Sequence, residues 1–518
     1  MSARSFAVIA MLLVLHGLSF GQNAHLQKAL ELFQKEHYTE ALQEFESARA
    51  AQPGNAAIEN ALGITETKLG RIEAANRHYL ESIRLNSGFE EAHKNLAFNY
   101  LSSNQFGPAE KELNTALHLQ PDDPYPHFYL VMLYLATSRD QQAVEQVKPS
   151  LPLLVNDRDT AFQLGKACFR MNRTDQAASI VNRLDSGDGF TLDERRELAN
   201  LFFEKHSYLE AAEQFRRIVS ADANSWENKF NLAVALLNAK KADEAIKILG
   251  PLAAERPNDA KTVSLLGSAY EGANKMPEAL EAYKREAYAN PQESDGYLDY
   301  TRLLMDLARY DEAQQFVAAG LKVVREPYPL YMRLGSVQMM ASKYDQARES
   351  FQRAVDEHPE ISVGYVALAQ ICFKTGQNEQ AAKLLADARQ KLKPDFLLEY
   401  YYGLSLDRLG KQGDAVTAFE KAVALNPDVA EIHFELGKLY FGTNRIDEAR
   451  AQLEKSIQIN PHYAKSYVYL SRIYARLGDS EKAHRLADQA RQFKQDEREE
   501  SVRSQESRLR SFQPLQSE

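Results

Sequence analysis

The chain has 518 residues, of which 44% are hydrophobic and 26% charged, so it can fold and lacks the composition of a disordered chain. Its formal net charge is -10 at pH 7, and no segment is rich in Lys and Arg. Phosphate binding needs a clustered basic surface, so this composition argues against a nucleic-acid partner.

The first 21 residues have the pattern of a secretory signal peptide. Arg4 supplies a positive charge, residues 6–15 are an unbroken apolar run, and Ser19 and Gly21 are small residues ahead of Gln22. The apolar run is too short for a stable membrane span. We therefore expect a signal peptide over 1–21, export to a periplasmic or extracellular location, and no stable membrane span after cleavage. An uncleaved anchor and a buried helix are the alternatives.

A 34-residue pattern then repeats fourteen times over residues 22–497, without insertion or deletion. Position 20 of the repeat is Ala in every copy, from Ala41 to Ala483, and position 8 is small in every copy except that of Val131. This regularity leaves no room between the repeats for another domain. The repeats begin at residues 22, 56, 90, 124, 158, 192, 226, 260, 294, 328, 362, 396, 430 and 464.

Each repeat carries two apolar stripes with helical period. In the thirteenth repeat, Ile432, Leu436 and Leu439 belong to the first stripe, and residues 446–457 carry the second. A short turn at residues 442–444 separates them. We expect a helix-turn-helix pair in every repeat. Positions 8 and 20 should lie where the two helices cross, because close helix packing needs small side chains.

The pattern resembles the tetratricopeptide repeat family. The residues that carry the resemblance in the twelfth and thirteenth repeats are Gly403, Gly410, Ala415, Phe419, Ala422, Pro427, Leu436, Gly437, Tyr440, Ala449 and Pro461. The resemblance implies an all-α fold, a right-handed α-solenoid superhelix of about fourteen helix pairs, with a concave face. The polar tail, residues 498–518, is expected to cap the end of the solenoid and to become disordered.

No pattern typical of catalysis or metal binding interrupts the repeats. The twelve histidines never come closer in sequence than nine residues, and no His-Glu-x-x-His or Gly-x-Ser-x-Gly motif occurs. We therefore expect no catalytic residue, no metal ion, no cofactor and no enzyme activity. Cys168 and Cys372 both occupy position 11, six repeats apart, so they should be free, buried thiols.

The resemblance also implies that the first helices line the concave face, where positions 2, 5, 9, 12 and 13 are exposed. Aromatic residues gather at these positions in repeats four to seven and eleven to thirteen. The eight proposed to contact a partner are Phe128, Phe162, Phe169, Phe203, Phe230, Tyr400, Phe434 and Phe441, and Phe373 occupies position 12 of the eleventh repeat. Rigid aromatic side chains are common at binding hot spots, so we expect a protein or peptide partner there. Packing between neighbouring repeats is the alternative explanation.

A polar set matches a known subtype of the family, in which two Lys or Arg and two Asn grip a C-terminal carboxylate. Arg196, Asn200, Asn231 and Lys261 fall at matching offsets, but Leu265 stands where a second clamp Arg is expected.

The predicted function is a non-catalytic protein-binding scaffold, active in envelope assembly, secretion or export. Two alternatives are open. The solenoids can associate with one another as a structural assembly or oligomerisation module. If the signal peptide is not used, the chain is a cytosolic chaperone adaptor.

Overall fold

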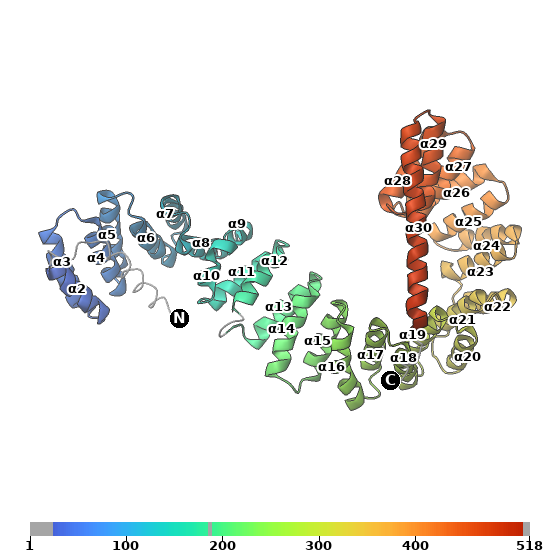
Figure 1. Ribbon diagram of the computed structural model, residues 1–518, viewed down its shortest axis with the longest axis horizontal. Coiled ribbons are helices and arrows are strands. Elements are labelled where there is room, and N and C mark those ends of the chain that lie inside the picture. Colours follow the sequence, from blue (N-terminus) through green and yellow to red (C-terminus); the bar gives the residue numbers. More distant parts are fainter. Residues whose placement is uncertain (1–23, 185–188, 511–518) are drawn as a thin grey trace. The chain divides into compact units, whose positions relative to one another are not determined.

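The computed structural model describes residues 24–184 and 189–510, and helices joined by short turns make up almost all of them (Figure 1). Within these ranges there are 29 helices, α2 to α30. None of these helices is both long and apolar enough to cross a membrane. The predicted signal peptide, residues 1–21, lies outside the described residues. The chain divides into two compact blocks, residues 1–239 and 240–518, which are taken separately below.

In the first block, first and second helices of successive pairs alternate. The first helices are α2 (Ala24–Gln34), α4 (Ala56–Lys68), α6 (Glu90–Ser102), α8 (Pro124–Ala136), α11 (Arg158–Arg170), α13 (Leu192–Glu204) and α15 (Trp226–Asn238). The second helices are α3 (Tyr38–Ala51), α5 (Ile72–Leu85), α7 (Phe106–Leu119), α9 (Asp140–Glu145) with α10 (Val147–Leu154), α12 (Thr174–Leu184) and α14 (Tyr208–Ala221).

The second block continues the alternation, beginning with a second helix, α16 (Ala242–Glu255). Its first helices are α17 (Ala260–Gly272), α19 (Asp295–Asp306), α21 (Tyr328–Met340), α23 (Ser362–Lys374), α25 (Phe396–Arg408), α27 (Ala430–Gly442) and α29 (Ala464–Arg476). Its further second helices are α18 (Met276–Ala289), α20 (Tyr310–Gly320), α22 (Tyr344–Glu357), α24 (Asn378–Lys391), α26 (Gln412–Leu425), α28 (Ile446–Ile459) and α30 (Ser480–Arg510).

The helix starts follow the 34-residue period. Second helices begin at this interval from Tyr38 to Ser480, and first helices from Ala56 to Ala464 with one shift, at Asp295. The expected all-α solenoid of about fourteen helix pairs is confirmed. The right-handed sense of its superhelix stays a prediction.

The two helices of a pair cross where their side chains are small, as expected. The alanine at position 20 is buried in every repeat, from Ala41 to Ala483. A glycine at position 8 allows an aromatic ring from position 24 to lie directly against the first helix. A Cβ added to Gly403 would come within 2.8 Å of the Phe419 ring, and one added to Gly267 within 2.6 Å of the Tyr283 ring.

The turn between the paired helices has the same backbone conformation in all fourteen repeats. The residue at position 15 has a φ between 54° and 84°. This left-handed conformation ends the first helix in the manner of a C′ residue. The residues are Glu36, Gly70, Asn104, Ser138, Asn172, His206, Lys240, Asn274, Ala308, Ser342, Gly376, Gly410, Asn444 and Gly478.

The fourth repeat departs from the pattern, because its second helix is divided into α9 and α10. Pro149 explains the division. A proline inside a helix has no N–H to donate, and its ring clashes with the carbonyl group four residues earlier. That carbonyl belongs to Glu145, the last residue of α9.

The last helix, α30, packs against α29. Ala483, Leu486 and Ala490 are buried, and the half-buried Phe493 meets Tyr467 edge-on at 5.1 Å. From Lys494 to Glu499 every side chain is exposed. The apolar face of α30 therefore covers α29 as far as Phe493, and residues 494–499 continue the helix with exposed side chains.

Candidate functional site

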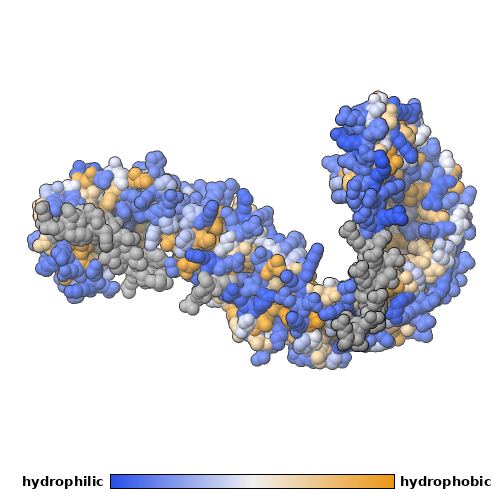
Figure 2. Space-filling view, viewed as in Figure 1, coloured by the Kyte–Doolittle hydropathy of each residue, from blue (hydrophilic) through white to orange (hydrophobic). Residues whose placement is uncertain are grey.

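The first helices of successive pairs lie side by side. In the second block α19 contacts α21, α23 contacts α25 and α27 contacts α29. In Figure 1, α21 and α23 lie on the inner side of the bend of this block, and α22 and α24 on its outer side. On the face in view, hydrophobic residues form small patches among hydrophilic ones rather than one continuous area (Figure 2).

Four of the eight aromatic residues predicted on the concave face are not exposed, so that expectation is wrong for Phe128, Phe162, Phe169 and Phe434. These rings fill the seams between neighbouring helices. The Phe169 ring on α11, for example, meets the Phe202 ring of α13 edge-on, with centroids 4.8 Å apart. The other four are half-buried and keep accessible surface: Phe203, Phe230, Tyr400 and Phe441.

Three of the clamp residues, Arg196, Asn200 and Asn231, belong to first helices of the first block. Arg196 is exposed and binds Asp193 of its own helix at 2.8 Å, and Asn200 is exposed one turn further along. Asn231 is half-buried on α15. Lys261 is exposed and belongs to the second block. The role of this set as a clamp stays a prediction.

The first helices α23 and α25 share a polar and aromatic contact. The Phe373 ring of α23 stacks on the Tyr401 ring of α25, with centroids 6.5 Å apart and an interplanar angle of 14°. Gln370 donates a hydrogen bond from Nε2 to the Tyr401 hydroxyl at 2.6 Å. The exposed Arg408 places its guanidinium 4.4 Å from the Phe373 ring centroid. This geometry is a cation–π interaction.

The same surface continues across α27 and α29. Lys438 of α27 forms an ion pair with Asp407 of α25 at 3.0 Å. Phe441 of α27 meets the Tyr469 ring of α29 edge-on at 5.8 Å. The exposed Arg472 lies 5.1 Å from the Tyr469 ring centroid.

These residues form one surface that spans four adjacent first helices, which we call the α23–α29 surface. It consists of Gln370, Phe373, Tyr401, Asp407, Arg408, Lys438, Phe441, Tyr469 and Arg472. Sequence reasoning found its position-12 aromatics but missed Tyr401 and Tyr469, which occupy position 6. Tyrosine at position 6 in the twelfth and fourteenth repeats was the signal available in the sequence.

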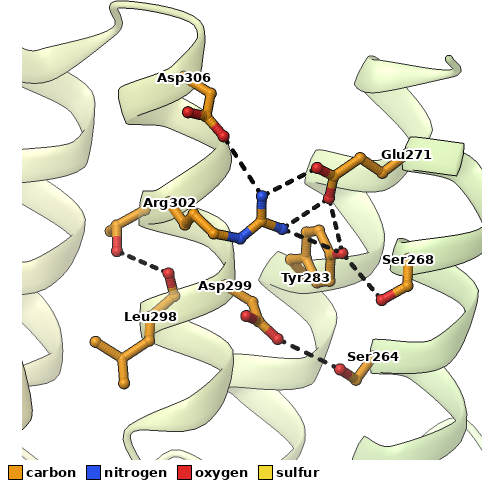
Figure 3. A network of polar contacts seen from close by, with 9 residues as sticks. Ser264, Ser268, Glu271, Tyr283, Leu298, Asp299, Arg302 and Asp306 are labelled. Atoms are coloured by element: carbon orange, nitrogen blue, oxygen red, sulfur yellow. Dashed lines mark hydrogen bonds and ion pairs between the residues drawn. The ribbon is translucent and has the colours of Figure 1, made fainter. Parts of the chain in front are cut away.

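A second polar cluster joins α17 to α19 (Figure 3). Arg302 binds both carboxylate oxygens of Glu271, at 3.0 and 2.7 Å, and these bonds raise the pKa of the guanidinium. The Tyr283 hydroxyl donates to the same carboxylate at 3.1 Å. Arg302 of α19 and Glu271 of α17 thus form an ion pair that holds these neighbouring helices together.

A buried carboxyl group, Glu286, lies on α18. Its Oε2 has no hydrogen-bond partner among the described residues. Burial raises its pKa to about 7, and the neighbouring carboxyl group of Asp299 adds to the effect. Burial also raises the pKa of Asp299, whose Oδ2 accepts a hydrogen bond from Ser264 at 3.4 Å. The carboxyl groups of Glu286 on α18 and Asp299 on α19 are thus partly buried and close enough for the charge of Asp299 to raise the pKa of Glu286.

Neither cluster has the parts of a reaction centre. In the ranges that the structure describes, no group of three or more His, Cys, Asp or Glu residues could hold a metal ion. Cys168 and Cys372 are free and buried, as predicted. Burial raises the pKa of the Cys168 thiol to about 12, so at neutral pH it is a small apolar group rather than a nucleophile.

Three sequence profiles described as tetratricopeptide repeat match the chain. The first matches residues 26–88, 301–360 and 403–464, the second matches residues 202–268 and 338–396, and the third matches residues 465–489. Together these segments make up more than half of the chain. The chain belongs to the tetratricopeptide repeat family. Tetratricopeptide arrays are scaffolds for protein–protein interaction and are generally not catalytic.

Curated proteins match the chain at low identity. Cellulose synthase operon protein C of Pseudomonas fluorescens is 21% identical over 66% of this chain and 26% of its own length. Anaphase-promoting complex subunit 3 of Schizosaccharomyces pombe is 20% identical over 47% of this chain and 37% of its own length. The chain thus spans 26% to 37% of these curated relatives.

Two solved structures resemble the chain over most of its length. Yeast Tom70 covers 94% of this chain and 95% of its own, with 13% identity and a TM-score of 0.41. The Cut9 and Hcn1 assembly of the APC/C covers 90% of this chain and 99% of its own, with 15% identity and a TM-score of 0.34. These TM-scores are too low to support an argument about this tetratricopeptide protein.

Proposed function

We propose that this protein is an exported, non-catalytic scaffold that binds a protein or peptide partner on the α23–α29 surface. The observation that carries the proposal is the continuity of this surface. Half-buried aromatic rings and exposed guanidinium groups follow one another across four adjacent first helices. Aromatic residues and Arg are the residue types enriched in binding hot spots.

Export rests on the N-terminal sequence. The chain starts with the charge, apolar run and small residues of a secretory signal peptide. One relative is named for a cellulose synthase operon, which supports a role in envelope assembly, secretion or export, although the match covers 26% of that protein. N-terminal sequencing of the mature protein tests the proposal directly. A first residue at Gln22 in the periplasmic or secreted fraction supports it, and an intact Met1 in the cytoplasm contradicts it.

The binding surface is tested by affinity capture from the native cells, with wild type beside Phe441→Ala/Tyr469→Ala. Both rings are half-buried, so their removal should disturb the surface more than the core. We expect the variant to keep its helical circular dichroism and to lose a protein that wild type recovers. Leu80→Ala/Leu209→Ala, which truncates two exposed apolar residues of second helices in the first block, is the control. Equal recovery by all three proteins would show that partners bind elsewhere.

A further inference from the structure

The α23–α29 surface carries more positive than negative charge, in contrast to the chain as a whole. Its four first helices carry six cationic side chains and four carboxylates. The cations are Lys374, Arg408, Lys438, Lys465, Arg472 and Arg476, and the carboxylates are Glu399, Asp407, Glu431 and Glu435. The whole chain has 62 Lys and Arg against 72 Asp and Glu. This local reversal of sign favours an anionic ligand.

Five of these six cations form no ion pair with any described residue, and Lys438 is the exception. Lys438 forms ion pairs with both Asp407 and Glu435. Among the described residues, Arg408 and Arg472 form no ion pair, and each lies over an aromatic ring instead. The ring orients the guanidinium and restricts its rotamers, so less side-chain entropy is lost when a carboxylate binds.

We infer that the partner binds here through an acidic, extended peptide segment whose carboxylates pair with Arg408 and Arg472. Guanidinium groups bind carboxylates through two parallel hydrogen bonds. The inference rests on the proposed function, since it names the chemistry of the partner at the same surface.

A peptide fits this surface better than an anionic polysaccharide. Sugars stack on free ring faces, and the rings here are in contact with neighbouring groups. Phe373 stacks on Tyr401 and lies beneath Arg408. Tyr469 receives the edges of Phe434 and Phe441 and lies beneath Arg472.

The helix spacing sets the distance between acidic groups in the ligand. Arg408 is on α25 and Arg472 on α29, with α27 between them. Packed helices lie about 8–10 Å apart, so the two guanidinium groups are roughly 20 Å apart. An extended peptide spans about 3.3–3.6 Å per residue. Acidic side chains about six residues apart should therefore reach both arginines.

The test uses the full chain and fluorescein-labelled peptides in fluorescence anisotropy. The main probe is a Ser/Ala peptide with two Glu-Glu pairs about six residues apart. Matched probes place the pairs side by side, replace Glu by Gln, or replace Glu by Lys. An oligogalacturonate of similar charge represents the polysaccharide alternative.

We expect the six-residue spacing to give the tightest binding, weakened by salt, and the Gln and Lys peptides to bind at least tenfold more weakly. Arg408→Ala/Arg472→Ala should lose at least tenfold in affinity. Lys421→Ala/Arg450→Ala, which removes two cations from second helices α26 and α28, should stay within about twofold of wild type. Circular dichroism checks the fold of each variant.

Equal binding of the Glu and Gln peptides, or full affinity in Arg408→Ala/Arg472→Ala, overturns the inference. So does binding of the oligogalacturonate without binding of the acidic peptide. A photo-crosslinker at position 441 tests the proposed function separately from the inference of an acidic ligand. A crosslinked protein partner in cells, together with no acidic-peptide binding, leaves the scaffold proposal intact and rejects the acidic ligand.

Discussion

The side chains at positions 8 and 24 of a repeat pack together in the space where its two helices cross. Glycine at position 8 faces an aromatic ring in four repeats: Gly63 with Tyr79, Gly267 with Tyr283, Gly335 with Phe351 and Gly403 with Phe419. Alanine occurs with leucine in the pairs Ala97 and Leu113, Ala233 and Leu249, and Ala369 and Leu385, all of them buried. Val131 and Thr301, the larger residues at position 8, are found with Val147 and Val317. In these nine repeats a larger residue on one helix accompanies a smaller one on the other, whereas Ala29 with Phe45 and Gly437 with Leu453 depart from this trend.

Because the two side chains share this space, the effects of substitutions at positions 8 and 24 on the free energy of unfolding should not be additive. Gly403→Ala should destabilise the protein by about 1–3 kcal/mol, because the new Cβ forces the Phe419 ring out of place. Phe419→Leu should cost about 1 kcal/mol or more through lost burial. The double variant recreates the combination of Ala369 and Leu385 and should be more stable than the sum of the single changes. Urea unfolding of the three variants measures the coupling, and additive effects would contradict a shared volume.

The buried carboxyl of Glu286 predicts a pH-dependent weakness. Its ordinary pKa of 4.5 rises to about 7 in the fold. Between these values the folded chain keeps a proton that the unfolded chain releases, so stability falls as pH rises from about 4.5 to 7. Glu286→Gln removes the ionisation and should stabilise the protein by about 1–3 kcal/mol at pH 8, with little effect at pH 4.5.

The measurement is hydrogen exchange of α17 to α19 at the two pH values, because an array of repeats need not unfold in one step. Glu281→Gln, on the same helix but at an exposed position, is the matched control and should change little at either pH. Equal stabilisation by Glu286→Gln at both values would show that packing rather than ionisation is responsible.

At the scale of the element, the left-handed residue at position 15 decides where every first helix ends. Ala308 has a φ of 56° there, a conformation that costs an L-residue about 1 kcal/mol and a glycine almost nothing. Ala308→Gly should therefore stabilise the protein by about 0.5–1 kcal/mol, and Gly410→Ala, with a φ of 72°, should destabilise it by a similar amount. Thermal unfolding of the two variants checks the opposite signs. A loss of stability in Ala308→Gly would show that the flexibility of the unfolded glycine dominates.

The helix pairs could be predicted from the sequence because one pattern is repeated in register. The alanine at position 20 is present in every copy, and its physical cause, the close crossing of two helices, is the same each time. The position-15 conformation was harder to find, since Glu36, Lys240 and Ala308 carry no signal of a left-handed residue. It is imposed by the turn between two packed helices, and only the glycines and asparagines of other copies indicate it.

The binding surface was predicted less well because phenylalanine at the predicted concave positions can either pack between neighbouring helices or remain accessible to a partner. Phe434 and Phe441 both belong to the predicted concave face, yet the first is 4% exposed and the second is half-buried. What distinguishes them is the neighbouring helix. Tyr463 and Tyr469 both meet the Phe434 ring, whereas Phe441 lies near the end of its helix and meets only Tyr469 among the aromatic rings described. Such contacts depend on residues about 30 positions away, which a pattern within one repeat does not include.

At the scale of the whole molecule, each repeat relies on the next to cover its apolar surface, so the last repeat must be covered by something else. In this chain the buried part of α30 supplies the cover. Ala483, Leu486 and Ala490 face α29, and Phe493 contacts Tyr467. The capping role expected of the polar tail, residues 498–518, stays a prediction.

Two truncations separate the contributions of the helix and the tail. Removal of residues 494–518 takes away only exposed side chains among those described, so the protein should stay monomeric and its melting temperature should change by about 1 °C or less. Removal of residues 480–518 uncovers Tyr467, Ile473 and Tyr474, and should cause self-association and faster hydrogen exchange in α29. Sedimentation velocity distinguishes the two proteins. Self-association after loss of residues 494–518 alone would contradict this account, because the removed segment would then be what keeps the ends of two solenoids apart.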